Sequence, residues 1–363
     1  MVDITDYRKV KQLIILGNGF DLTCGLKSQY ADFYSSVKDN FNNVLVDYAF
    51  EMKLKNPNWA DVESNLLDLL NSFASYYKGD YKGDDAMLFD LLDNLSSKYR
   101  SKGYIEKHIR DKKMENLPIA FSLMKEEVKE FEKRLVIYLK SQILIGKYNR
   151  NSRKLAVSLC LAEYFDDLLY ADEDERTEKF KERKRLIQTG EYIADFFSFN
   201  YTPVYKGANP HQIQNIHGSI DGSNTILGID GHEAEDDLLE FTKTYRLLSH
   251  SQVTDRIDLY QRFHCIKFFG HSLGEADYSY FQSIFDGLDL YNAKTKLFFY
   301  FEVYDPEKRT EIISNNYHAV SKLLKHYGET FKSNPDHGKN LMHKLILEGR
   351  LTVKELDCSL LDK

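Results

Sequence analysis

The stretch QLIILGNGFD, residues 12–21, decides the fold. Its first half is a short apolar run that ends in glycine, a pattern typical of a strand buried on both faces of a parallel sheet. A glycine-rich turn between a strand and a helix can bring backbone N–H groups close to a diphosphate. Asn-Gly also favours a type I′ hairpin, but a helical pattern follows and not a second alternating strand. The stretch therefore predicts a strand, a nucleotide-binding turn and a helix.

This turn carries two of the three glycines of the G-x-G-x-x-G fingerprint. Glycine is expected where a Cβ would block the approach of the backbone to a phosphate. The fifth residue is expected to contact a ribose or a developing cation, or to cap the helix. The predicted ligand contacts in this turn are Gly17, Asn18, Gly19, Phe20 and Asp21.

Helical patterns without a convincing strand follow the turn. Residues 29–54 are amphipathic, with aromatic and aliphatic residues three and four positions apart. Further helices are expected at 61–77, 86–97, 117–144, 151–169 and 173–188. We interpret residues 36–189 as a helical insertion or cap.

Runs rich in β-branched and aromatic residues return after residue 190. Strands are expected at 192–199, 213–216, 225–229, 264–270 and 296–304, and helices at 236–247, 252–262 and 275–292. Alternating strands and helices predict an α/β domain with a largely parallel, Rossmann-like sheet. Residues 10–35 and 190–305 would form this discontinuous nucleotide-binding domain, and residues 306–363 a helical C-terminal segment.

Polar turns follow three of these expected strands. In an open parallel sheet, ligands bind outside the carboxyl ends of the strands. Asn200 is expected to position a ribose hydroxyl or a water, or to bond its own backbone, and His217 can act as a general base. The last turn offers N–H groups and a hydroxyl to a ribose or phosphate, although its serine can instead cap the next helix with Glu275. The contacts predicted there are Gly270, His271, Ser272 and Asp277.

Composition restricts the class of protein. The chain has 363 residues and a formal charge of -7, which argues against broad, non-specific attraction to nucleic acid. Its four cysteines are scattered without a CxxC pair, so no zinc site of paired cysteines is expected. No apolar run approaches the roughly 18 residues of a membrane span, and the N-terminus lacks the apolar core of a signal peptide. These features predict a soluble cytoplasmic protein that does not enter a membrane.

The sequence Ile-Leu-Gly-Asn-Gly-Phe-Asp-Leu, with Phe199-Asn200-Tyr201-Thr202, Ile216-His217-Gly218 and Gly270-His271-Ser272-Leu273, strongly resembles the AbiH family of bacterial antiphage proteins. The same order of motifs is more remotely similar to sirtuin-type NAD-binding domains, whose antiphage relatives hydrolyse NAD+. That resemblance implies NAD+ as the substrate, with no prosthetic group. It places Gly17 and Gly19 at the pyrophosphate, Asn200 at the ribose or water, His217 as base, and Ser272 at a ribose.

The chain also departs from the sirtuin pattern. Asn18, Phe20 and Asp21 replace the small residues that are usual in the sirtuin loop, and no cysteine quartet exists for the zinc module of protein deacylases. Deacylation is therefore not expected. The resemblance instead implies an abortive-infection effector that cleaves the nicotinamide–ribose bond, with a phage-derived trigger and a homo-oligomeric state as open expectations.

A second hypothesis is a nucleotide-sensing or nucleic-acid-binding defence protein without NAD+ hydrolysis. Residues 98–113 contain seven Lys or Arg with interleaved Tyr, which could meet phosphates and stack on bases. The residues whose neutralisation would test it are Lys107, Arg110, Lys112 and Lys113. The alternative interpretation is an ordinary basic loop of an acidic protein.

Overall fold

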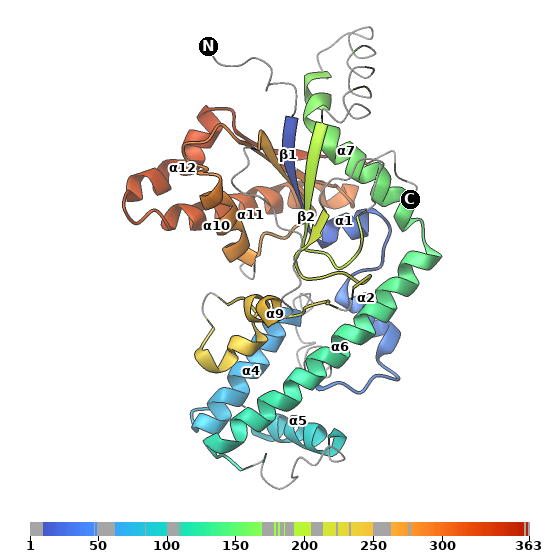
Figure 1. The fold of residues 1–363 in the computed structure, drawn as a ribbon, viewed down its shortest axis with the longest axis vertical. Helices are drawn as coiled ribbons and strands as arrows, with labels where there is room; N and C mark the ends of the chain where they lie inside the picture. The colour runs from blue at the N-terminus through green and yellow to red at the C-terminus, as the bar shows by residue number, and fades with distance from the viewer. Residues whose placement is uncertain are drawn as a thin grey trace. The chain divides into compact units, whose positions relative to one another are not determined.

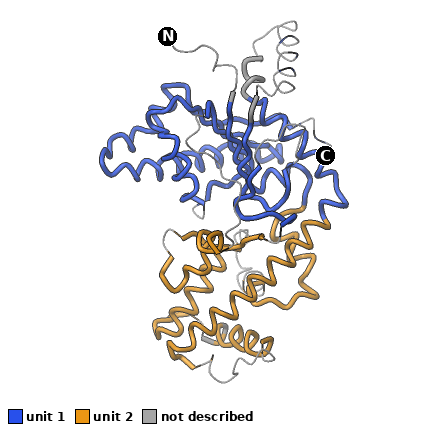
Figure 2. The backbone as a smooth tube through the Cα atoms, viewed as in Figure 1, with its two compact units in different colours: residues 1–26, 142–223, 253–363 blue, residues 27–141, 224–252 orange. Residues whose placement is uncertain are grey.

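The chain forms two compact units, shown in Figures 1 and 2. Unit 1 contains residues 1–26, 142–223 and 253–363, and unit 2 contains residues 27–141 and 224–252. The computed structural model describes residues 10–46, 48, 62–83, 85–99, 109, 111–168, 178, 181, 185, 192–204, 213–222, 224–231, 234–249, 263–274, 277–358 and 361.

Unit 1 is built on a six-stranded sheet in which every neighbouring pair is parallel. The strands are β1 (Val10–Leu16), β2 (Tyr192–Ser198), β3 (Ile213–Asn215), β4 (Cys265–Phe269), β5 (Lys296–Phe301) and β6 (Leu351–Glu355). Their order across the sheet is β3-β2-β1-β4-β5-β6. The predicted parallel α/β architecture is therefore confirmed.

The register aligns the ends of the strands. Leu16 pairs with Ser198 on one side and with Phe269 on the other, and Ser198 pairs in turn with Asn215. The segments that follow β1, β2, β3 and β4 consequently leave the sheet from the same edge, in one row.

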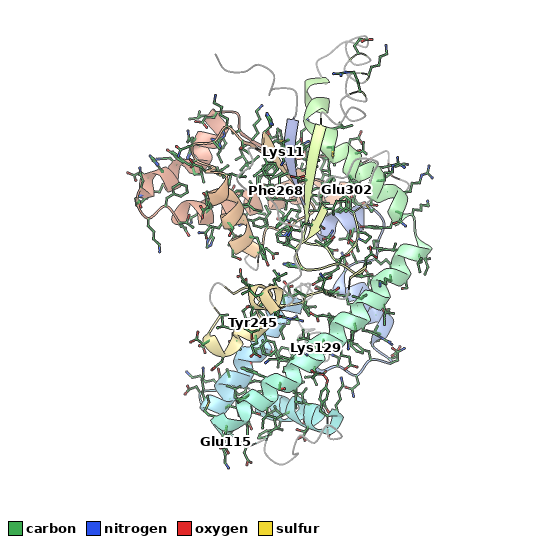
Figure 3. All side chains as sticks on the ribbon, in the orientation of Figure 1. Lys11, Glu115, Lys129, Tyr245, Phe268 and Glu302 are labelled. Atoms are coloured by element: carbon green, nitrogen blue, oxygen red, sulfur yellow. The ribbon has the colours of Figure 1, made fainter. Side chains whose placement is uncertain are left out.

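One face of the sheet carries the main hydrophobic core. Phe268, labelled in Figure 3, stacks on Phe299 with ring centroids 4.4 Å apart. Residues of α10 (Tyr278–Gly287), α11 (Arg309–Glu329) and α12 (Pro335–Leu347) complete this core. The short 3-10 helix η7 (Pro306–Lys308) precedes α11. Burial of this many aromatic and aliphatic side chains is the dominant stabilising contribution in such a domain.

The opposite face meets α7 (Tyr148–Leu168) through polar groups. Lys267 of β4 is fully buried, and its Nζ donates to the carbonyl oxygens of Leu159 and Cys160 at 2.7 and 3.0 Å. Gln12 of β1 donates to the same Cys160 oxygen at 3.2 Å. These bonds compensate for the loss of water around a buried ammonium group. They also attach α7, and with it the adjoining α1 (Asn18–Thr23), to the sheet.

Unit 2 is helical. Its elements are α2 (Tyr30–Val37), α3 (Val44–Val46), α4 (Val62–Lys78), α5 (Asp85–Lys98), η4 (Met114–Asn116), the first part of α6 (Leu117–Ile145), η5 (Asp236–Phe241) and α9 (Lys243–Ser249). Buried carboxylates connect them. Glu127 of α6 is fully buried and accepts from Tyr99, at 2.6 Å, and from the Val44 N–H, at 2.7 Å. Lys98 contributes an ion pair to the same carboxylate at 2.7 Å.

Three expectations about secondary structure were wrong. The helix expected over 29–54 ends at Val37, and Asn43 Oδ1 then accepts from the N–H groups of Leu45 and Val46 to start α3. Residues 225–229 form no strand but a single parallel bridge, Ile229 to Thr242. The C-terminal segment contains β6 in addition to its helices. The helix expected at 252–262 and most of that at 173–188 lie outside the described residues.

Among the residues that the structure describes, no helix is both long enough and apolar enough to cross a membrane.

Candidate functional site

The turns after β1 and β4 are packed backbone against backbone. The N–H groups of Gly17 and Gly19 donate to the carbonyl oxygens of Phe269 and Gly270 at 3.0 and 2.7 Å. A Cβ at Gly17 would lie 2.5 Å from His271 Cα, and one at Gly19 would lie 2.5 Å from Gly270 Cα. The absence of a Cβ at these two glycines therefore permits a close approach between two turns of the protein itself.

The stretch expected as a turn is the start of α1, which begins at Asn18, and its side chains differ in exposure. Asn18 is exposed, whereas Phe20 is fully buried in the core. Since the N–H groups of Gly17 and Gly19 are engaged within the protein, any phosphate bound at this edge would need other donors.

Asp21 lies at the centre of a buried hydrogen-bond network. Its side chain is 2% exposed, and it accepts from the Thr202 hydroxyl at 2.8 and 2.7 Å and from the Tyr148 hydroxyl at 2.9 Å. Burial raises the pKa of Asp21 to about 6, against the lowering effect of its bonds to Thr202, Tyr148 and Asn200. The carboxylate therefore connects α1, α7 and the turn after β2 within unit 1.

Asn200 is held in place from two directions. Its Nδ2 donates to the Gly17 carbonyl at 3.0 Å, and its own carbonyl accepts from Asn215 Nδ2 at 2.7 Å. Asn215 also donates to the Thr202 carbonyl at 3.0 Å. Asn200 is 6% exposed, so Gly17 holds its side-chain amide and Asn215 of β3 holds its backbone.

The raised pKa of Asp21 predicts a pH-dependent stability. Between the unfolded value of 3.8 and the folded value of about 6, the folded state binds a proton that the unfolded state has lost, so stability falls as pH rises through this window. Well above pH 6, the buried Asp21 carboxylate lowers the free energy of unfolding by on the order of 3 kcal/mol, relative to a pH at which Asp21 is protonated in both states. Asp21→Asn should therefore gain stability relative to wild type as pH rises from 4.5 to 7.

Urea unfolding of both proteins across this pH range measures the difference. Asp221→Asn, which changes an exposed carboxylate of the same unit, should keep a constant difference from wild type. A difference in the free energy of unfolding between Asp21→Asn and wild type that does not change with pH would contradict the raised pKa of Asp21.

Two histidines and a carboxylate meet beside this network. Asp277 Oδ2 lies 3.4 Å from His271 Nε2, and its Oδ1 lies 3.9 Å from His217 Nε2. The side chains of His217 and His271 are 5% and 4% exposed, and that of Asp277 is 16% exposed. Phe199 packs edge-on against both imidazoles, with centroids at 5.5 and 4.4 Å. One carboxylate can therefore compensate for positive charge on either ring.

The turn after β4 sets the orientation of His271. Its Nδ1 accepts from the Leu273 N–H at 2.9 Å, which places the proton of a neutral ring on Nε2, facing Asp277. Leu273 adopts φ 55°, a left-handed conformation that costs a non-glycine residue about 1–2 kcal/mol. Ser272 is exposed. α10 begins at Tyr278, directly after Asp277, so the alternative in which Ser272 caps this helix is not found.

The structure thus forms two groups from the predicted residues. Asn200, Asp21 and Gly17 belong to one hydrogen-bonded group, and His217, His271 and Asp277 form the other. Sequence reasoning missed Tyr148, Thr202 and Asn215, because they act through contacts with residues distant in the chain. Within the described residues, no group of three His, Cys, Asp or Glu side chains could hold a metal ion.

Part of the basic run at 98–113 is described. Lys112 lies over the Tyr76 ring at 4.7 Å, and Lys113 lies 3.9 Å from Asp111 and 4.0 Å from Glu115. Lys107 and Arg110 lie outside the described residues. The two described lysines of this test set therefore have partners within the protein.

Comparison with known proteins gives one match. The model of a protein family described as Bacteriophage abortive infection AbiH matches residues 13–300. No curated protein and no solved structure matches the chain.

Proposed function

The chain belongs to the AbiH family, whose model covers most of its length, and we propose that it carries out the abortive-infection role of that family by hydrolysing NAD+. Membership of the family implies the antiphage role. The proposal adds the chemistry: unit 1 binds NAD+ at the carboxyl edge of its sheet and cleaves the nicotinamide–ribose bond after a phage-derived trigger.

The topology of the sheet supports a dinucleotide as the ligand. From β1 the chain adds β2 and β3 on one side of the sheet, and β4, β5 and β6 on the other, so the order of strands reverses between β1 and β4. This order, 3-2-1-4-5-6, is that of doubly wound dinucleotide-binding sheets. Ligands of open parallel sheets bind at such a reversal. The predicted contact residues follow the two strands on either side of it, at 17–21, where α1 begins, and at 270–272 with Asp277, which precedes α10.

The observation that carries the proposal is the pairing of a fixed amide with a histidine–carboxylate group at this same edge. In the hydrolysis, the bond between C1′ of the ribose and the nicotinamide nitrogen breaks, and its electron pair leaves with nicotinamide. The sugar becomes an oxocarbenium-like cation, and water adds to C1′ as it loses a proton. NAD+ and water thus give nicotinamide, ADP-ribose and a proton.

Each residue then has a defined task. Asn200 Nδ2 is bonded to Gly17, which leaves the Oδ1 atom to position the attacking water and to face the cationic sugar. His217 accepts the proton from that water. Asp277 stabilises the imidazolium that results. Ser272, which is exposed in the turn after β4, contacts the ribose. The resemblance to sirtuin-type domains agrees with these assignments.

Chromatography of the reaction products tests the proposal. Purified protein incubated with NAD+ should release nicotinamide and ADP-ribose in equal amounts, either alone or after addition of lysate from phage-infected cells. Release that is absent under both conditions, with NAD+ left intact, would contradict it.

Asp277→Asn should lower kcat by roughly 10- to 100-fold with little change in KM, because the variant loses a charge-assisted interaction that is made only when His217 becomes positive. Asp221→Asn, an exposed change of the same charge in unit 1, should leave both constants unchanged. Equal kcat values for Asp277→Asn and wild type would show that Asp277 is not a positioning residue in this mechanism.

A further inference from the structure

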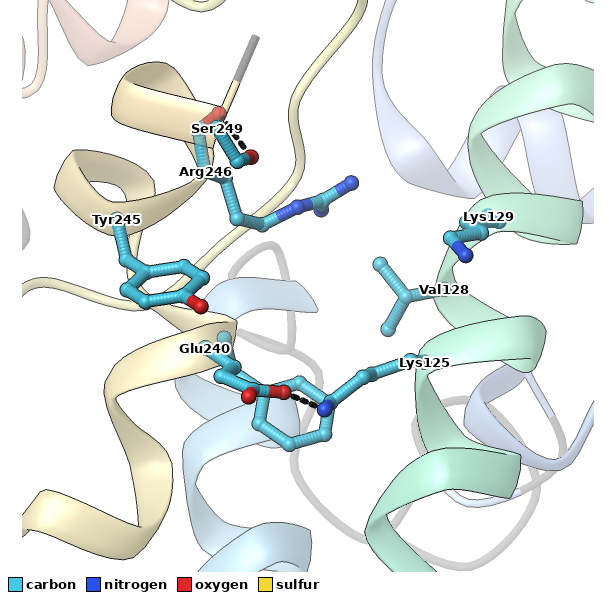
Figure 4. Close-up of a pocket in the computed structure, with 8 residues that line it drawn as sticks. Lys125, Val128, Lys129, Glu240, Tyr245, Arg246 and Ser249 are labelled. Carbon is cyan, nitrogen blue, oxygen red and sulfur yellow. Dashed lines mark hydrogen bonds and ion pairs between the residues drawn. The ribbon is translucent and has the colours of Figure 1, made fainter.

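Unit 2 contains a cavity that the proposed hydrolysis does not use. It lies between α6 and the η5–α9 segment and has a volume of about 150 Å³. Figure 4 shows Lys125, Val128 and Lys129 on the α6 wall, and Tyr245, Arg246 and Ser249 on the facing wall. Glu240 and Phe241 complete the lining. All of these residues belong to unit 2.

The walls of the cavity are fixed by contacts around it. Arg246 of α9 makes a bidentate ion pair with Glu132 of α6 at 2.6 and 3.0 Å, and the Phe121 and Phe241 rings meet edge-on at 5.5 Å. Lys243 is 2% exposed and lies 2.7 Å from Glu63. A cavity with walls held in this way keeps its shape before a ligand arrives, which reduces the entropic cost of binding.

The lining of the cavity holds three basic side chains and one carboxylate, and each basic group is paired with a carboxylate. Lys125 and Lys129 lie four residues apart on α6, a spacing that brings like charges together on one helix face. Burial lowers the pKa of Lys125, and the charge of Lys129 lowers it further. Glu240 pairs with Lys125, and Lys129 lies 3.2 Å from the exposed Glu126 outside the cavity. Two of the three carboxylate partners, Glu126 and Glu132, lie outside the lining, so a ligand in the cavity meets more basic than acidic side chains.

Tyr245 adds an aromatic surface at the cavity. Tyr245 is 44% exposed, so part of this residue is open to solvent at the cavity. Val128 and Phe241 supply apolar surface beside it. A ring at this position can stack on a flat organic group, and its hydroxyl can bond to an anion.

From these features we propose that the cavity binds a phosphate monoester with a flat organic group. The phosphate lies between Lys125 and Lys129, whose two charges match a dianion, and the organic group lies against Tyr245. The organic group extends from the phosphate across the exposed ring of Tyr245. Glu240 competes with the phosphate for Lys125.

Isothermal titration with adenosine monophosphate and with inorganic phosphate tests this site in the full chain. Adenosine monophosphate should bind more tightly than inorganic phosphate, and Tyr245→Ala should abolish the difference. Lys125→Gln combined with Lys129→Gln should weaken binding by roughly 10-fold or more, the effect of losing charge-assisted bonds. Glu240→Gln should strengthen binding several-fold, because it releases Lys125.

Lys133→Gln combined with Lys140→Gln is the matched control, since it makes the same charge change at exposed positions of α6 outside the cavity. This control should bind as wild type does. Unchanged binding in the Lys125/Lys129 double variant, equal loss in the control, no saturable binding, or equal affinity for the two probes would each overturn the proposal. None of these outcomes depends on NAD+ hydrolysis.

Discussion

His217→Ala is expected to lower the rate of NAD+ hydrolysis by roughly 10²- to 10⁴-fold, the contribution typical of a general base. The imidazole is buried beside Phe199 and Tyr280, with Nε2 directed at Asp277. Alanine removes the only proton acceptor that the mechanism assigns to the attacking water. Because the lost interaction forms in the transition state, kcat should fall while KM changes little.

The control for this variant is His318→Ala, which removes an exposed histidine from α11 of the same unit. It should retain the wild-type rate. Because His217→Ala also empties a buried position, circular dichroism and the urea-unfolding midpoint must first show that the variant is folded. A folded His217→Ala protein that hydrolyses NAD+ within threefold of the wild-type rate would exclude His217 as the base.

Gly270→Ala is expected to destabilise unit 1 by about 2–5 kcal/mol, the combined cost of a left-handed alanine and an overpacked contact. Gly270 has φ 68°, and a Cβ there would lie 2.4 Å from the Phe20 backbone nitrogen. The contact is with backbone, which cannot rotate away as a side chain can. The turns after β1 and β4 would have to separate, and the hydrogen bond from Gly19 N–H to Gly270 would be lost.

Gly25→Ala separates the two causes. Gly25 has φ 83°, but a Cβ there would have no heavy atom within 4 Å. This variant should therefore lose only the roughly 1–2 kcal/mol of the left-handed conformation. Urea unfolding followed by circular dichroism compares the two variants, and equal losses would show that the close packing of the two turns contributes nothing.

Much of unit 1 could be predicted from local pattern. The apolar run that forms β1 is followed by glycine, and aromatic-rich runs mark β2, β4 and β5. Parallel pairing then requires the polar turns at Asn200 and His217 to leave the sheet at one edge. β6 was missed because its sequence, LTVKE, lies at the sheet edge and buries no residue completely.

The partners of the site residues could not be predicted, because they depend on contacts between distant parts of the chain. Tyr148 reaches Asp21 across 127 positions, and Asn215 reaches Thr202 across 13. The role of Gly17 and Gly19 shows the same limit. The sequence pattern indicates that a Cβ is excluded there. Only the structure shows that Gly270 and His271 occupy the space that a Cβ would need.

The proposed function requires that this AbiH protein consumes NAD+ when phage infects the cell. The most direct test measures cellular NAD+ through a synchronised infection in cells that produce wild type or the double variant Asn200→Ala/His217→Ala at equal levels. We expect NAD+ to fall, and nicotinamide and ADP-ribose to rise, only in infected cells with the wild-type protein. Protection against the phage by the wild-type protein while NAD+ stays constant would contradict it.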